Sequence, residues 1–204
     1  MSTRRLIPLR LLVAALTFVA APLGAQTSRL YLGGARGGVR LMPPGPAFGR
    51  TSPPVTAVAL GYLAPSGVGG EVRASRFHVV VTEALPPRMF PEAPYTIGLR
   101  ATIVEASLGY RPSALRLGLL QPVASAGVLV ALVVDSYESD TPEEQLRSYS
   151  TGLSAATGVE ARLGGRVTLT GRGSYQHLRA SSTRPARAVG LSGLAWEIGI
   201  RVYR

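Results

Sequence analysis

The chain has 204 residues, a length suited to one domain, and it contains neither cysteine nor lysine. The lack of cysteine excludes a disulfide framework and a thiolate metal site. Its 22 arginines against 11 acidic residues give a formal net charge of +11, a balance also found in nucleic-acid-binding proteins. However, there is no amphipathic basic helix and no cluster of aromatic residues interleaved with arginine, so nucleic acid is not an expected partner.

The first 25 residues are typical of an export signal. Three arginines precede an apolar run over residues 11–21, which is too short to span a bilayer, and the segment ends on a small residue, Ala25. The sequence predicts cleavage between Ala25 and Gln26. Residues 26–204 then form the exported domain.

From about Arg29 onward, eight strand-like stretches are joined by connections that alternate between long and short. The long ones are Met42–Pro53, Glu83–Pro94, Asp135–Arg147 and Ala180–Arg187, and the short ones are Ala64–Gly67, Arg111–Ala114 and Gly164–Gly165. Such alternation is typical of an up-and-down barrel in an outer membrane, with long loops outside and tight turns in the periplasm. The sequence therefore predicts an all-β fold, an eight-stranded antiparallel up-and-down transmembrane β-barrel in the outer membrane of a Gram-negative bacterium, with periplasmic termini.

The first three stretches differ in how clearly they assign their two faces. The first, Arg29–Leu41, is rich in glycine, and its facing is ambiguous. Because side chains alternate across a strand, the next two each show an apolar face. These faces are formed by Val58, Leu60 and Tyr62 in the second stretch and by Val68, Val72 and Ala74 in the third.

The fourth and fifth stretches are less regular. In Tyr95–Tyr110 the apolar phase moves from odd to even positions, which predicts a β-bulge near Ile103. The fifth stretch, Leu115–Val134, is apolar on both faces from Val123 onward. Its arginine, its proline and its β-branched end favour a strand over a membrane helix.

The last three stretches alternate cleanly, and the final one is the clearest. One face of Tyr149–Leu163 carries Ser150, Ser154, Glu160 and Arg162, and polar side chains recur in the same way along Arg166–Gln176. In the final strand the even positions are apolar and the odd positions include Glu197 and Arg201. In a barrel the apolar face contacts lipid. The predicted lipid-facing residues are Leu194, Trp196, Ile198, Ile200 and Val202.

Four glutamates lie on four different strands, each on the predicted lumen face and each in the half nearer the periplasmic turns. Buried carboxylates need partners, and arginines share the same faces. We expect a lumen charge network of Glu71, Arg73, Glu105, Glu160, Arg162, Glu197 and Arg201, which Arg100, Arg166 and Arg172 could also reach. An eight-stranded barrel is just wide enough to be filled by side chains. This favours a structural plug over a gated ion or proton path.

Catalytic, metal-binding and cofactor-binding constellations are weak. The chain has two histidines, His78 and His177, and neither has an adjacent acidic residue. Ser181 and Ser182 are close to His177 in the sequence, but strand alternation predicts that His177 faces lipid. A nucleophile needs a base and an orienting third group. The acidic stretch Asp135–Glu144 lacks the spacing of a calcium loop. We therefore expect no catalytic residue, no metal site and no cofactor.

The export signal, the alternation of connections, the interior Glu/Arg pattern and the strand Leu194–Tyr203 together resemble the transmembrane domain of outer membrane protein A and related eight-stranded barrels. The resemblance is architectural and covers residues 26–204. It departs at the end of the chain, where Arg204 follows the aromatic Tyr203. It implies recognition by the barrel assembly machinery, and it does not settle activity, because one barrel scaffold hosts many functions.

The function expected from these features is a structural or surface-interaction role, with loops that contact lipopolysaccharide or the outside. Exposed arginines can hold phosphate with two parallel hydrogen bonds, so outer-membrane lipid and lipopolysaccharide are the expected partners of a monomeric barrel. Two alternatives stay open, a narrow pore and a lipid A-modifying enzyme.

Overall fold

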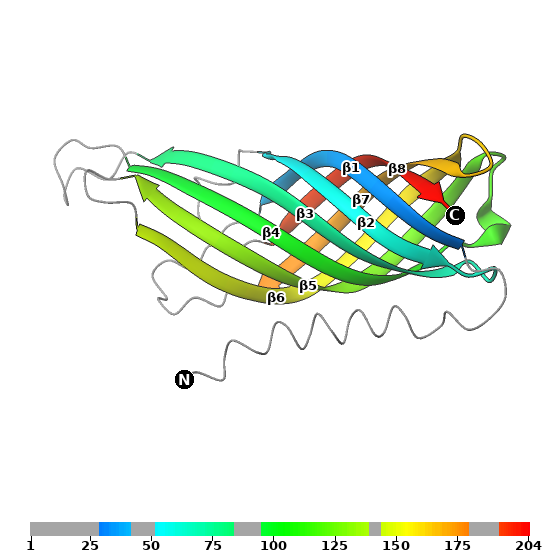
Figure 1. The fold of residues 1–204 in the computed structure, drawn as a ribbon, viewed down its shortest axis with the longest axis horizontal. Coiled ribbons are helices and arrows are strands. Elements are labelled where there is room, and N and C mark those ends of the chain that lie inside the picture. Colours follow the sequence, from blue (N-terminus) through cyan, green and yellow to red (C-terminus); the bar gives the residue numbers. More distant parts are fainter. Residues whose placement is uncertain (1–28, 42–51, 84–94, 139–143, 180–191) are drawn as a thin grey trace.

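The computed structural model describes residues 29–41, 52–83, 95–138, 144–179 and 192–204 (Figure 1). Eight antiparallel strands close into one barrel in chain order, with β1 paired to both β2 and β8. The strands are β1 (Arg29–Leu41), β2 (Pro54–Leu63), β3 (Val68–Glu83), β4 (Tyr95–Tyr110), β5 (Leu120–Glu138), β6 (Glu144–Arg162), β7 (Val167–Arg179) and β8 (Gly193–Tyr203). The predicted fold is confirmed. The predicted signal segment and much of the predicted long loops lie outside the described residues.

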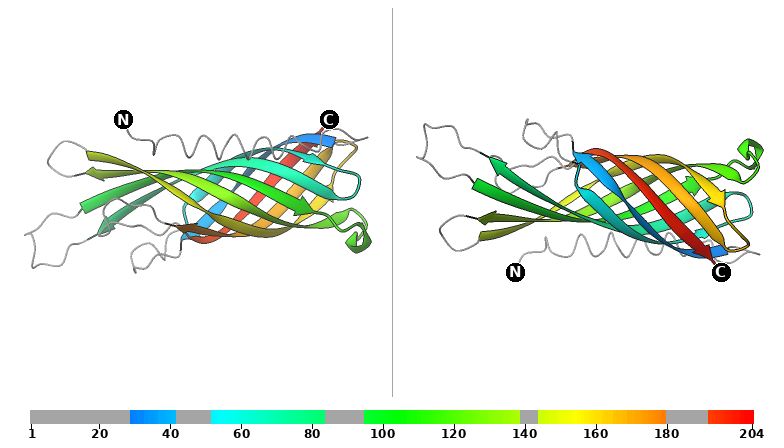
Figure 2. Two further views of the ribbon diagram at one scale, coloured as in Figure 1. Left: turned by 90° about the horizontal axis from the view of Figure 1, so that it is seen from below. Right: turned by 90° about the horizontal axis from the view of Figure 1, so that it is seen from above.

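The two ends of the barrel differ. One end, which we call the turn end, carries the connections 64–67, 111–119 and 163–166 and the C-terminus, as Figure 2 shows from two sides. At the opposite loop end, β3 to β6 extend further along the barrel than the shorter strands β1, β2, β7 and β8 (Figure 1). Within the described residues there is no helix long and apolar enough to cross a bilayer.

Strands β5 and β6 continue past the residues where their apolar pattern ends. The segment Asp135–Arg147 was expected to be a loop, but Asp135 pairs with Leu146 and Tyr137 pairs with Glu144. Backbone hydrogen bonds hold a ladder together without an apolar face. Where a strand extends beyond the membrane, both of its faces can carry polar side chains. The alternation of apolar and polar residues then stops before the strand does, and it underestimates the length of the strand.

The connection between β4 and β5 is longer than predicted. The 3-10 helix η2 (Ser113–Leu115) begins it, and Leu117 and Leu120 then exchange two backbone hydrogen bonds. Gly118 has a φ of +60°, a left-handed conformation that favours glycine. This turn starts β5 at Leu120 instead of at the predicted Leu115.

The predicted bulge in β4 is wrong. From Tyr95 to Tyr110 this strand pairs with β3, and from Thr96 to Tyr110 with β5, without any break in register. Ala101 and Ile103 face the lumen just as Glu105 does, and all three are buried. The apolar phase changes along β4 because the content of the lumen changes from charged to apolar, and the backbone keeps its regular alternation.

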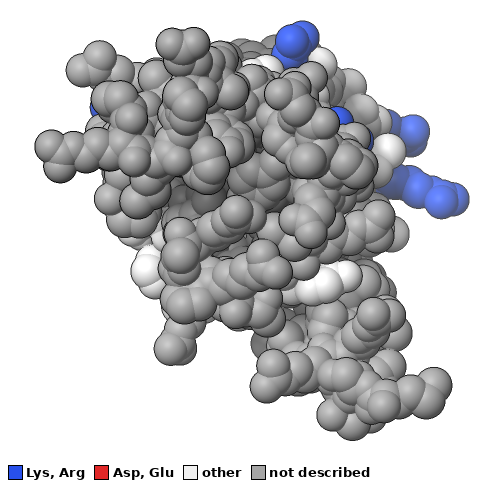
Figure 3. Space-filling model, turned by 90° about the vertical axis from the view of Figure 1, so that its left-hand side faces the viewer, with Lys and Arg blue, Asp and Glu red and all other residues white. Residues whose placement is uncertain are grey.

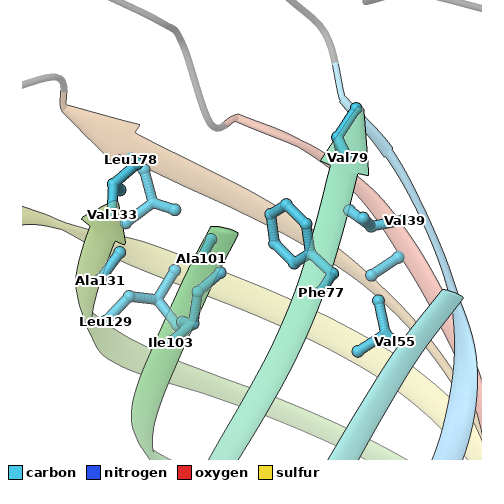
Figure 4. Packing of buried hydrophobic residues seen from close by; sticks show 11 residues of the cluster. Val39, Val55, Phe77, Val79, Ala101, Ile103, Leu129, Ala131, Val133 and Leu178 are labelled. Atoms are coloured by element: carbon cyan, nitrogen blue, oxygen red, sulfur yellow. The ribbon is translucent and has the colours of Figure 1, made fainter. Parts of the chain in front are cut away.

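The apolar part of the lumen lies toward the loop end. Eleven buried side chains from every strand except β6 form it, and Figure 4 shows them converging inside the barrel. They are Val39, Val55, Phe77, Val79, Ala101, Ile103, Leu129, Ala131, Val133, Leu178 and Ala195. This lumen cluster is the hydrophobic core of the protein.

The outward face is apolar over most of the barrel. In β8 the structure places Leu194, Trp196, Ile198, Ile200 and Val202 outward and exposed, with Trp196 at 56% and Ile198 at 58%, while Glu197 and Arg201 are buried inside. β1 likewise has a definite facing, with Tyr31, Gly33 and Val39 inside and Leu30 and Leu32 outside. A large exposed apolar surface that wraps a closed barrel is suited to contact with lipid.

Candidate functional site: the lumen charge network

Four glutamates come together inside the barrel at its turn-end half. Glu71 lies on β3, Glu105 on β4, Glu160 on β6 and Glu197 on β8, and their exposed fractions range from 2% to 7%. The alternation of side chains along each strand predicted that these four carboxylates face the lumen, and the structure places them there. Since an isolated buried carboxylate is strongly unfavourable, the positions of the arginines decide whether this interior is stable.

The layer nearer the turn end is centred on Glu160. Arg111 holds this carboxylate with two parallel hydrogen bonds of 2.8 Å, from Nε to Oε2 and from the terminal nitrogen to Oε1. Arg201 also contacts Glu160, and its second terminal nitrogen contacts Glu71. Arg201 therefore joins two carboxylates that come from opposite sides of the barrel.

The layer further inside is built around Arg73 and Arg172. Arg73 Nε lies 3.1 Å from Glu71 Oε1, and its terminal nitrogen contacts Glu197. Arg172 pairs with Glu105 and lies 3.9 Å from Glu197. The hydroxyl of Ser154 donates a further hydrogen bond of 2.8 Å to Glu105.

Tyr31 connects the network to the wall of the barrel. Its hydroxyl donates a hydrogen bond of 2.8 Å to Glu71, and the guanidinium of Arg201 lies 4.7 Å from the centre of its ring. A Cβ atom at Gly61 would lie only 2.4 Å from the tyrosine ring. Glycine at this position therefore makes room for the ring to lie flat against β2.

The described network contains four glutamates and four arginines, so its formal charge is zero. A cavity of about 40 Å³ remains between these side chains, which is room for a few water molecules. Paired charges of this kind stabilise little compared with an apolar filling, but removing one partner is strongly unfavourable. The geometry is that of a mutually satisfied plug.

The network differs from the predicted one at two arginines, Arg162 and Arg111, and of the three further arginines that could have reached it only Arg172 does so. Arg162 is not part of it, because it is the last residue of β6 and is exposed where the strand leaves the barrel. Arg111 takes the contact with Glu160 instead. Arg172 does reach inward, whereas Arg100 and Arg166 are exposed and form no ion pair within the described part of the chain.

On either side of the network the lumen has a different character. Toward the turn end it opens into a cavity of about 390 Å³ that Arg29, Arg111, Arg116 and Arg162 line together with Glu160. Toward the loop end the lumen cluster begins, with Ile103 and Leu129 almost fully buried. The interior is therefore charged in one half and apolar in the other, a division that sequence alternation did not predict.

The candidate serines, Ser181 and Ser182, lie outside the described residues, and His177 instead approaches Ser192, which the sequence did not single out. His177 is outward-facing and exposed, and its Nδ1 lies 3.4 Å from Oγ of Ser192. The backbone N–H of Leu178 already donates to that hydroxyl at 3.2 Å. His78 is exposed on β3, and among the described residues no group of three His, Cys, Asp or Glu side chains is placed so that it could hold a metal ion. The acidic residues 140 and 143 lie outside the described segments.

No protein-family model matches the sequence, and no curated protein matches it. Solved structures do match the fold. A major outer membrane protein from Thermus thermophilus has a TM-score of 0.61 and 14% identity, covering 88% of this chain and 100% of its own. OprG from Pseudomonas aeruginosa has a TM-score of 0.61 and 14% identity, over 89% and 98%. Neisserial surface protein A has a TM-score of 0.56 and 17% identity, over 88% and 98%. The fold is that of small eight-stranded outer-membrane barrels.

Proposed function

We propose that this chain, which has the fold of small outer-membrane β-barrels, is a non-enzymatic structural or surface-interaction protein of the bacterial outer membrane. In this role the barrel is a closed scaffold that anchors its loops at the cell surface. The observation that carries the proposal is the two-part filling of the lumen, a neutral Arg–Glu network below an apolar cluster.

The apolar cluster opposes the alternative of a narrow pore. Phe77, Ile103 and Leu129 are at most 3% exposed inside the barrel. Moving an ion from water into such surroundings is opposed by at least several kcal/mol, of order 20 in an idealised apolar medium. A charged network alone could be a wet pathway, but here a packed apolar cluster lies in series with it, and the uncharged polar side chains buried beside that cluster include Ser150 and Gln176.

We expect purified wild-type protein to give no steady conductance in planar bilayers. The physical reason is the apolar section, so the result should not change with salt concentration or voltage. Heat-modifiable migration on gels establishes that the inserted material is a folded barrel. A reproducible single-channel current from such material would favour the pore over the scaffold.

The third candidate, a lipid A-modifying enzyme, has one observation in its favour, the contact between His177 and Ser192. A distance of 3.4 Å is long for a hydrogen bond, and among the described residues no carboxylate orients the imidazole. We expect lipid A from cells with wild-type protein, Ser192→Ala protein or no protein to have the same masses. A mass change that requires Ser192 would instead support the enzyme.

The proposed partners follow from this role. Outer-membrane lipid surrounds the exposed apolar face, and lipopolysaccharide is the anionic partner that arginine-bearing loops would contact. The barrel assembly machinery would insert the chain, and pairing of β1 with β8 closes the sheet along the part that all eight strands share. We therefore propose a monomer.

A further inference from the structure

Basic side chains gather on the outward face of β1, β3 and β4. Arg36, Arg76 and Arg100 are all exposed there. Arg36 lies opposite Thr56 on β2, and Thr56 lies opposite Arg76, so these three residues form one row across the barrel wall. Because neighbouring strands are about 4.8 Å apart, two arginines that flank one strand are about 10 Å apart at the backbone.

Strand β4 completes the group. Arg100 lies directly opposite His78, and Thr102 lies directly opposite Arg76. Side chains opposite one another on antiparallel strands have Cβ atoms about 5 Å apart. We call this group the outer-face basic patch: Arg36, Thr56, Arg76, His78, Arg100 and Thr102. Figure 3 views the barrel from the loop end, with the arginines of the described residues visible mainly at its upper and right-hand margins.

The charge of the patch is not compensated by the described protein. Every glutamate whose side chain the structure describes faces the lumen. None of the three patch arginines forms an ion pair with a described residue. Three guanidinium groups and two hydroxyls therefore face outward together, all of them hydrogen-bond donors.

The patch also lies at a boundary. On the same outward face, the residues nearer the turn end are apolar: Leu32 on β1, Val58 and Leu60 on β2, Val72 and Ala74 on β3, and Val104 on β4. Away from the patch, β6 carries Leu153 outward, and β8, which pairs with β1, carries the apolar Ile198 directly opposite Arg36. A face that turns from apolar to cationic toward the loop end matches lipid chains followed by anionic headgroups.

We propose that the outer-face basic patch binds the phosphate groups of an outer-leaflet glycolipid. Guanidinium groups can hold phosphate oxygens with paired hydrogen bonds, and the threonine hydroxyls can add single ones. The acyl chains of the same lipid would lie along the apolar residues below the patch. The site is built by the barrel wall alone; it rests on the proposed placement of the loop end at the cell surface, but not on any contact made by the loops.

The test measures lipid binding by a variant in which Arg36, Arg76 and Arg100 are all changed to Gln. The matched control carries Arg29→Gln, Arg116→Gln and Arg162→Gln, three exposed arginines at the turn end. The probe is bisphosphorylated lipid A in phosphatidylcholine nanodiscs, and native mass spectrometry counts the lipid A that stays bound to each barrel. Since one charge-assisted hydrogen bond corresponds to about a tenfold change in affinity, the patch variant should bind at least about tenfold more weakly, and the control should match the wild type.

Two further arms identify what is recognised. Dephosphorylated lipid A should bind the wild type as weakly as bisphosphorylated lipid A binds the patch variant. Inorganic phosphate alone should not reduce the amount of lipid A that stays bound to the wild type. If the triple variant fails to fold, Arg76→Gln against Arg116→Gln gives the same comparison with about a tenfold effect. Equal lipid A binding by wild type and patch variants, or equal binding of the dephosphorylated lipid, would overturn the proposal.

Discussion

Arg201→Ala is expected to destabilise the folded barrel by about 3–5 kcal/mol, because it breaks a buried set of ion pairs. Arg201 is the residue that joins Glu71 to Glu160, and it also packs over the ring of Tyr31. Without it Glu71 keeps Arg73 and Glu160 keeps Arg111, but each loses one of its two cationic partners. The measurement is unfolding by urea from lipid vesicles, followed by the fluorescence of Trp196.

The control for this variant is Arg166→Ala. Arg166 is exposed in the turn between β6 and β7, where removing an arginine should change stability by at most about 1 kcal/mol. A double variant, Arg201→Ala with Glu71→Gln, should recover part of the loss, because only Glu160, and no longer Glu71, is then short of a cationic partner. Equal unfolding midpoints for Arg201→Ala and Arg166→Ala would mean that the lumen is wet and its charges are solvated.

Ile198→Arg is expected to cost about 2–4 kcal/mol if position 198 lies near the middle of the bilayer, and less if it shares the headgroup depth of Arg36, with which it pairs on β1. Ile198 is 58% exposed in the isolated barrel, so an arginine there meets no steric obstacle from the protein. The loss arises from placing a guanidinium group among lipid chains. Folding yield into vesicles and the urea midpoint both report it.

The matched control is Leu117→Arg. Leu117 is 75% exposed in the turn-end connection between β4 and β5, where the surroundings are water. The same kind of substitution at a similarly exposed site should then be close to neutral. If Leu117→Arg were as disruptive as Ile198→Arg, the turn end would also be embedded in an apolar environment and the assignment of the lipid face would need revision.

Strand alternation was sufficient to predict the barrel and the facing of β8, because both depend on local periodicity. The partners inside the lumen depend on register and on barrel closure, which no single strand encodes. Arg111 illustrates this. It was assigned to a turn, yet it continues the odd-numbered lumen face of β4 beyond Ile103 and Glu105. Extending that parity by one step would have identified it.

The apolar half of the lumen was missed for a related reason. Alternation between polar and apolar residues distinguishes two faces only when the faces differ. Around Leu129 and Val133 on β5 both faces are apolar, and on β4 the polar Arg100 and Thr102 face outward while Ala101 and Ile103 face the lumen cluster. The sequence pattern then has no contrast on β5, and the phase change in β4 was attributed to a backbone irregularity that the structure does not contain.

The position of the charged side chains along the chain bears on how the barrel assembles. Glu197 and Arg201 lie on β8, the last strand to be synthesised, yet they pair with residues of β3 and β6. A nascent intermediate with seven strands would therefore hold Arg73 without Glu197, and Glu71 and Glu160 without Arg201. Docking of β8 against β1 completes the backbone ladder and neutralises the interior in one step. Pairing of β1 with β8 should thus be strongly cooperative, so that barrels with only part of this ladder formed are sparsely populated. Formation of the β1–β8 ladder would then be the last step of folding.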